Sequence, residues 1–162
     1  MRRLVSATDQ AVDQWHSRAA RVMKMDQKLT QGTDDWFEMV GSLMCDAARR
    51  SGLSPDLTVS LVERYTDGAL LADGAVQGIR FDIINGIPTF RNGVGREERG
   101  DVTIEITSSL ARKLNLLRTV DSEYRALLQS AVSSGDLKID GDPSRLGSWL
   151  SEVHDPIVER TK

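Results

Sequence analysis

Cysteine is almost absent from this sequence of 162 residues, in which Cys45 is the only one. A disulfide within the chain is therefore excluded, and we expect a reducing compartment, the cytoplasm, as the location of the protein. The neighbours of this cysteine are hydrophobic, with Leu43 and Met44 before it and Ala47 close behind. We interpret it as a small buried hydrophobic residue rather than a reactive thiol.

The sequence also lacks a long hydrophobic run. No segment approaches the roughly 20 apolar residues of a membrane-spanning helix. The first residues, MRRLVSATDQAVDQW, contain neither the hydrophobic segment nor the small-residue cleavage site of a signal peptide. The 21 basic and 24 acidic residues give a net charge of −3. We therefore expect no integral membrane contact and no nucleic-acid partner, since the latter requires a strongly basic surface.

Catalytic and metal-binding signatures are missing as well. The sequence has no G-x-S-x-G, P-loop or G-x-G-x-x-G motif. Its two histidines, His16 and His154, are far apart and have no partner at metal-ligand spacing, so we predict no metal and no cofactor. We interpret His154 as a residue of the last turn of the final helix, where a cation is favourable. The question of an enzyme stays open, and the sequence favours a non-catalytic role.

Two amphipathic helices are expected in the N-terminal part. Residues 8–30 place apolar side chains at intervals of three and four, which is typical of a helix with one buried stripe. Thr33 is a typical N-cap for the second helix, because Asp34 and Asp35 follow it in the first turn. Gly52 and Pro55 mark the end of this helix.

The apolar period changes to two after the second helix, which predicts β-strands. Alternation occurs in four segments: residues 57–65, 79–83, 102–107 and 137–140. Asn85-Gly86 is the strongest short signal for a two-residue hairpin, and it predicts a further strand that returns through Phe90. Val62 and Glu63 blur the first pattern, as they would at a bulge or at the end of a strand.

The alternating strands have one apolar and one polar face. We therefore expect a sheet that helices cover on one side and solvent covers on the other. The residues expected on the covered face are Phe81, Ile83, Ile104, Ile106, Leu137 and Ile139. Residues 67–78 and 92–100 are expected to be loops, the second of them solvated.

Three C-terminal helices would complete the cover. The first begins near residue 108, and the second runs from about residue 121 to Gly135. The last is predicted as one helix, with Asp142-Pro143 at its start and Asp155-Pro156 at its end.

This order of elements resembles the sterol carrier protein 2 (SCP2-like) domain family. The closest local matches are residues 101–107, which lead into the helix at Leu110, and the segment GDLKIDGD at residues 135–142. The resemblance implies an α+β domain over residues 33–162, in which a five-stranded, mostly antiparallel sheet carries helices on one face and encloses an apolar tunnel. Residues 1–32 would form an amphipathic helical extension that could pack on the sheet edge, cover the tunnel or pair two copies into a homodimer.

The first functional hypothesis is the carriage or sequestration of a large apolar small molecule, such as a lipid, an acyl chain, a polycyclic or a polyketide-like compound. The cavity would lie between the sheet and the helices. The residues expected to line it are Met39, Leu43, Phe81, Phe90, Leu114, Leu128 and Trp149. The clustering of methionines near the N-terminus is consistent either with ordinary core or with a cavity that adapts to its ligand.

The second hypothesis is a small biosynthetic enzyme, a cyclase or isomerase, acting in the same cavity. Its candidate polar groups are Asp82, Glu105, Tyr65 and Tyr124, although ion pairs across a wet sheet face would explain the charged ones equally well. A buried acid with a raised pKa would favour chemistry, and a purely apolar lining would favour carriage. A third hypothesis, an oligomerisation or adaptor domain with a filled core, requires no cavity.

Overall fold

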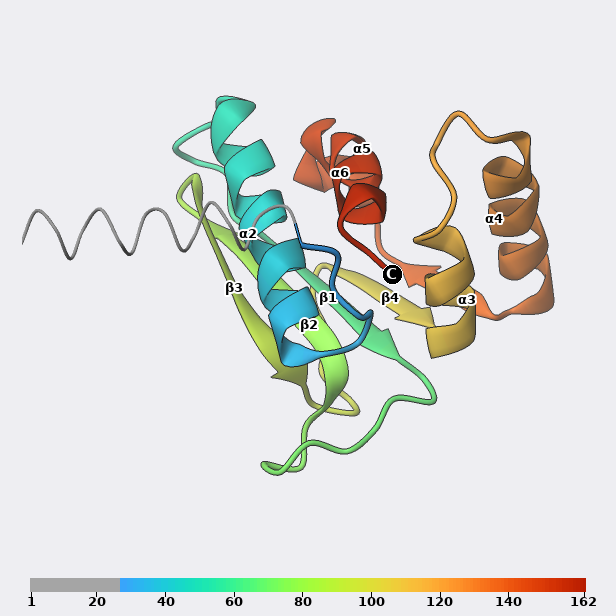
Figure 1. The fold of residues 1–162 in the computed structure, drawn as a ribbon. Coiled ribbons are helices and arrows are strands. Elements are labelled where there is room, and N and C mark those ends of the chain that lie inside the picture. Colours follow the sequence, from blue (N-terminus) through green and yellow to red (C-terminus); the bar gives the residue numbers. More distant parts are fainter. Residues whose placement is uncertain (1–26) are drawn as a thin grey trace, which may run out of the picture.

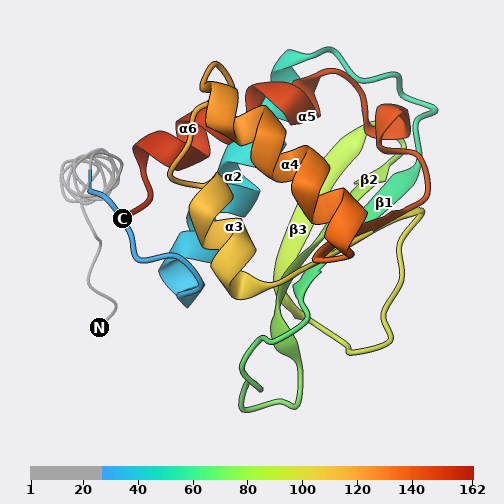
Figure 2. The ribbon, with the colours of Figure 1, turned by 90° about the vertical axis from the view of Figure 1, so that its right-hand side faces the viewer.

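A five-stranded sheet carries the helices on one face in a computed structural model that describes residues 27–162 (Figure 1, Figure 2). The strands are β1 (Val59–Tyr65), β2 (Val76–Ile84), β3 (Ile87–Val94), β4 (Val102–Ile106) and β5 (Leu137–Asp140). Their spatial order is β3-β2-β1-β4-β5, and every neighbouring pair is antiparallel except β1 and β4. The predicted fold class is confirmed, whereas most of the predicted helix over residues 8–30 lies outside the described residues.

The helices begin where the sequence signals place them. They are α2 (Asp34–Arg50), α3 (Ser108–Leu114) and α4 (Ser122–Ser134), followed by three short C-terminal helices. The Thr33 hydroxyl accepts a hydrogen bond from the Trp36 amide at 3.3 Å and so caps α2. Gly135 ends α4 in the left-handed conformation, with φ of 83°.

The predicted single C-terminal helix is wrong. The structure divides it into a 3₁₀ turn η1 (Pro143–Leu146), α5 (Trp149–Glu152) and α6 (His154–Glu159). Gly147, with φ of 106°, ends the helical conformation after η1. Pro156 does not end a helix but occupies the first turn of α6, where its missing N–H leaves no hydrogen bond unmade.

The register of the strands puts the six predicted residues on one face. Ile104 lies opposite Glu63 of β1 and opposite Ile139 of β5, and Phe81 lies opposite Leu61 of β1. Because opposite residues share a face, Phe81 and Ile104 are both directed toward the helices. The predicted covered face is confirmed.

The blurred pattern in β1 is not a bulge, because its pairing with β2 continues without a shift through Val62 and Glu63. Val62 is apolar because the other face of the sheet has a small buried cluster of its own, with Val76 and Val94. The register shift lies in β2 instead, between Val76 and Ile79.

The far face of the sheet is also less wet than expected. Residues 95–100 pass over it, and the Arg64 guanidinium donates to the Glu98 carbonyl oxygen at 2.6 Å and to the Glu105 carboxylate at 2.8 Å. Arg64 is only 7% exposed as a result. The segment predicted to be a solvated loop is therefore held against the sheet.

Candidate functional site: a cavity between the sheet and the helices

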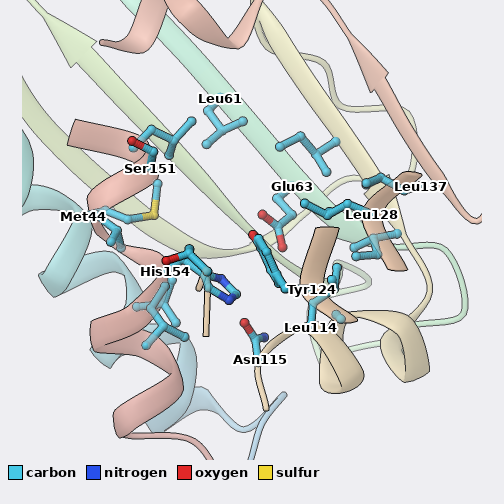
Figure 3. A pocket seen from close by; sticks show the side chains of 18 of the residues that line it. Met44, Leu61, Glu63, Leu114, Asn115, Tyr124, Leu128, Leu137, Ser151 and His154 are labelled. Carbon is cyan, nitrogen blue, oxygen red and sulfur yellow. The ribbon is translucent and has the colours of Figure 1, made fainter. Parts of the chain in front are cut away.

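A cavity of about 380 Å³ lies between the covered sheet face and the helices α2, α3, α4, α5 and α6 (Figure 3). We call it the main cavity because its lining is more apolar than that of a larger hollow beside α2. Aliphatic and aromatic side chains form most of its wall. They are Trp36, Val40, Met44, Leu61, Ile104, Ile106, Ala111, Leu114, Leu128, Leu137, Ile139, Leu150, Val153 and Ile157. A cavity of this size and lining is typical of sites for apolar small molecules.

The space exists because α4 contacts the core weakly. Ala131 is the only buried residue among the 13 residues of α4, and Leu128 is half-buried. On the sheet below, Ile104 is half-buried and Ile139 of the edge strand β5 is 47% exposed. The side chains between α4 and the strands therefore leave a hollow instead of interlocking, as they do in a close-packed core.

Glu63 is the one acidic side chain in the lining. It stands in the middle of the sheet, where its partners across the two adjacent strands are Ile79 and Ile104, and its carboxyl group points into the cavity (Figure 3). Within residues 27–162, the carboxyl group forms no hydrogen bond and no ion pair. Burial raises the pKa of Glu63 to about 7, because the ionised form loses hydration without gaining a partner.

Tyr124 and His154 face Glu63 from the helices. Their rings stack with centroids 4.5 Å apart, and Figure 3 shows the Tyr124 hydroxyl directed toward the carboxyl group. His154 Nε2 lies 2.8 Å from the Leu117 carbonyl oxygen, so it carries the proton in the neutral ring and leaves Nδ1 as an acceptor. Burial raises the pKa of Tyr124, which therefore stays a neutral hydrogen-bond donor.

The other polar side chains of the lining have partners. The Asn115 amide donates to Gln31 at 3.2 Å, the Thr119 hydroxyl donates to Asp155 at 3.0 Å, and the Ser151 hydroxyl donates to the Ser148 carbonyl at 2.8 Å. No lysine or arginine lines the cavity among the described residues. Glu63, Tyr124 and Nδ1 of His154 are thus the groups left free to bind a ligand's polar atom.

The structure distributes the predicted ligand-binding residues over three places. Leu114 and Leu128 line the main cavity, whereas Met39, Leu43 and Phe90 line a second hollow of about 640 Å³ beside α2. Phe81 and Trp149 belong to the packed core, where they are 0% and 1% exposed and their ring centroids are 5.2 Å apart. For all seven residues, a role in ligand binding stays a prediction.

The predicted catalytic candidates are also divided. Glu105 and Asp82 lie on the far face of the sheet, paired with Arg64 at 2.8 Å and Arg80 at 2.9 Å, and the hydrogen bond from Arg64 lowers the pKa of Glu105. Tyr65 is buried on the helix side and accepts a hydrogen bond from Gln31 at 3.1 Å. Tyr124 alone lines the cavity.

Glu63 was not predicted as a site residue, although the sequence contained its signal. Side chains alternate along a strand, so Glu63 lies on the same covered face as Val59 and Leu61. A charged residue is unusual at such a position. The prediction that His154 lies in the last turn of the final helix was wrong as well. His154 is the first residue of α6, and its side chain lines the cavity. The helix breaks between α5 and α6 at Val153, directly before His154.

Within residues 27–162, no cluster of three or more acidic, histidine or cysteine side chains could hold a metal ion. The same part of the chain contains no helix long and apolar enough to cross a membrane.

The fold is found again among solved structures. A crystal structure of sterol carrier protein 2 matches over 81% of this chain and 99% of its own, with 15% identity and a TM-score of 0.49. A ubiquinone synthesis protein, UbiJ-SCP2, matches over 70% of this chain and 75% of its own, with 14% identity and a TM-score of 0.38. Several of the similar structures are thus sterol carrier protein 2 or SCP2-domain proteins, as the sequence resemblance suggested.

A third match is the inverting sec-alkylsulfatase Pisa1 from Pseudomonas sp., with 26% identity and a TM-score of 0.35. It covers 60% of this chain, which spans only 14% of that enzyme's length. No family model matches the sequence, and no curated protein matches it.

Proposed function

We propose that the protein binds a large apolar small molecule in the cavity between the sheet and the helices, as a carrier or sequestering protein. The observation that supports this most directly is the cavity of about 380 Å³ with its largely aliphatic wall. A space of this size in a packed domain reduces stability, because the side chains around it lose contacts. A ligand would restore those contacts.

The energetics favour a large ligand. Burial of one methylene contributes about 0.8 kcal/mol, so eight methylenes contribute roughly 6 kcal/mol. Micromolar binding requires roughly 8 kcal/mol even before the entropy of association is included. A long acyl chain, a polycyclic or a polyketide-like compound would therefore be needed.

Native mass spectrometry of the purified protein, searching for a co-purified apolar compound, is the first test. The second is displacement of a neutral pyrene-labelled alkane. Leu128→Trp, which fills the cavity, should weaken binding at least about tenfold, whereas Leu43→Trp in the hollow beside α2 and Arg80→Ala on the far face should change it little. Loss of binding in the Leu43 or Arg80 variant with normal binding in the Leu128 variant would place the ligand elsewhere.

Glu63 favours a second candidate function, acid–base catalysis on a ligand in the same cavity. With a pKa of about 7, its carboxyl group is populated in both protonation states near neutral pH. It could take a proton from a carbon next to a ketone while the Tyr124 hydroxyl donates a hydrogen bond to the developing enolate oxygen. Return of the proton at another carbon would complete an isomerisation without a cofactor.

Deuterium uptake tests this second function. A polycyclic ketone in D₂O should incorporate deuterium next to its carbonyl group faster with the wild-type protein than with Glu63→Gln, as measured by mass spectrometry. Uptake at equal rates with both proteins would leave binding as the only function. The variant retains the shape of the side chain and removes its acid–base chemistry.

A further inference from the structure

Glu63 has no structural role that explains its position. It lies between Ile79 and Ile104 on the covered sheet face, and among residues 27–162 its carboxyl group has no hydrogen-bond or ion-pair partner. Glu63 is partly buried, and a polar group that is withdrawn from water without a partner usually reduces stability, because it loses hydration and gains nothing in return. The missing partner would have to come from the occupant of the cavity.

The charge of the cavity restricts what this partner can be. No lysine or arginine lines it among the described residues, so a ligand carboxylate or phosphate would find no permanent cation and would meet a second acid. A ligand hydroxyl could donate a hydrogen bond to the Glu63 carboxylate, and a protonated amine could also form an ion pair with it. Both head groups share the ability to donate a hydrogen bond.

We propose that the cavity selects apolar ligands with a hydrogen-bond-donating head group, a hydroxyl or a protonated amine, and that Glu63 receives this head group. This inference rests on the proposed binding function and names its ligand class. The apolar wall would hold the chain or ring system, and Tyr124 would position the head group from the side of α4. Fatty acids are excluded as the preferred ligands.

The test compares tetradecylamine, tetradecanol and tetradecanoate, each below its critical micelle concentration, as competitors of the neutral pyrene-labelled alkane. Near pH 8, where Glu63 is mostly ionised, we expect the amine to compete at least about tenfold more strongly than the carboxylate, with the alcohol between them. Glu63→Gln should remove most of this difference. The control, Glu123→Gln, neutralises an exposed carboxyl group next to Tyr124 in sequence and should preserve the ranking.

Lowering the pH adds an independent readout. Protonation of Glu63 below about pH 6 should reduce the advantage of the amine over the alcohol. His154 from α6, Tyr124 from α4 and Tyr65 from β1 are the other titratable side chains near Glu63, and burial keeps both tyrosines neutral throughout this range. Glu63→Gln retains His154 and both tyrosines, so the comparison with wild type isolates the effect of the carboxyl group.

The outcomes separate this inference from the proposed function. If the alkane binds and Leu128→Trp prevents its binding, but the three head groups compete equally or the ranking survives Glu63→Gln, head-group selection is wrong and apolar binding remains. Stronger competition by tetradecanoate than by tetradecylamine also overturns the inference. If the alkane does not bind to the wild-type protein, both proposals fail.

Discussion

The two ends of the same sheet are covered in different ways. Above β2 and β3, the 17-residue helix α2 buries eight residues, among them Trp36, Phe37 and Ala48. Beside β5, the 13-residue helix α4 buries Ala131 alone. We refer to the first as the packed half, for the number of side chains that α2 buries although a hollow also lies beside this helix, and to the second as the hollow half. The sheet offers apolar residues to both, so the difference arises from how closely each helix approaches.

The closeness of that approach depends on small residues. Gly41 of α2 sits directly against the ring of Phe90 of β3, where a Cβ atom would clash. At the hollow half, Leu128 and Tyr124 of α4 line the cavity together with Leu137 and Ile139 of β5. A cavity in this fold therefore needs no special wall, only a helix that buries few side chains against an otherwise ordinary apolar face.

The largest effect should come from Trp149, which belongs to the packed half. It is 1% exposed, packs on Phe81 and donates its indole N–H to the Leu146 carbonyl oxygen. Trp149→Ala should lower the free energy of unfolding by about 3–5 kcal/mol, because the void cannot close. Urea unfolding measures this, and an unchanged midpoint would show that the C-terminal helices do not contribute to the core.

Glu63 should make the hollow half sensitive to pH. Burial raises its pKa from 4.5 to about 7, so the folded state favours the neutral carboxyl group. Its contribution to stability is fully present below about pH 4.5 and is lost as the pH rises through about 7, by up to about 3 kcal/mol. Glu63→Gln should therefore gain stability relative to wild type between pH 4 and pH 8.

The readout for Glu63 is the difference between the two urea unfolding free energies at each pH. Taking the difference removes the contribution of every other titrating group. A difference that does not vary with pH would show that Glu63 has a partner in the folded protein.

Much of the fold could be predicted from the sequence, because its signals are local. Thr33 as a cap, Asn85-Gly86 as a hairpin and the alternation of Ile104 and Ile106 each depend on a few neighbouring residues. Asn85 and Gly86 have φ of 52° and 75°, as a two-residue turn of this kind requires. The C-terminal helix was mispredicted because the capping residues at its two expected ends give no information about a break between them, which occurs at Gly147.

The candidate site was harder to predict, because it depends on how far apart two elements stand. Leu43 and Leu128 have similar apolar surroundings in the sequence, yet one lines the hollow beside α2 and the other the main cavity. Glu63 appeared only as an interruption of the strand pattern. Its meaning depends on the register of β1, which places it on the helix side with Leu61.

Gly41→Ala tests the close approach that defines the packed half. The added methyl group would collide with Phe90, so the variant should lose about 1–3 kcal/mol although alanine favours helix formation. Ala111→Val, which adds volume toward the cavity, should cost less than about 1 kcal/mol because space is available there. Equal losses in both variants would mean that the two halves are packed alike.

The smallest effect should come from Leu128, because it borders a space that already exists. Leu128→Ala should lower the free energy of unfolding by about 1 kcal/mol or less, since the half-buried side chain has few contacts to lose. The matched control in the packed part is Leu146→Ala, where a leucine that is 0% exposed should cost about 2–5 kcal/mol. Urea unfolding of both variants without ligand gives the comparison. A loss at Leu128 as large as that at Leu146 would show that the cavity closes in solution and that α4 packs on the sheet as tightly as α2 does.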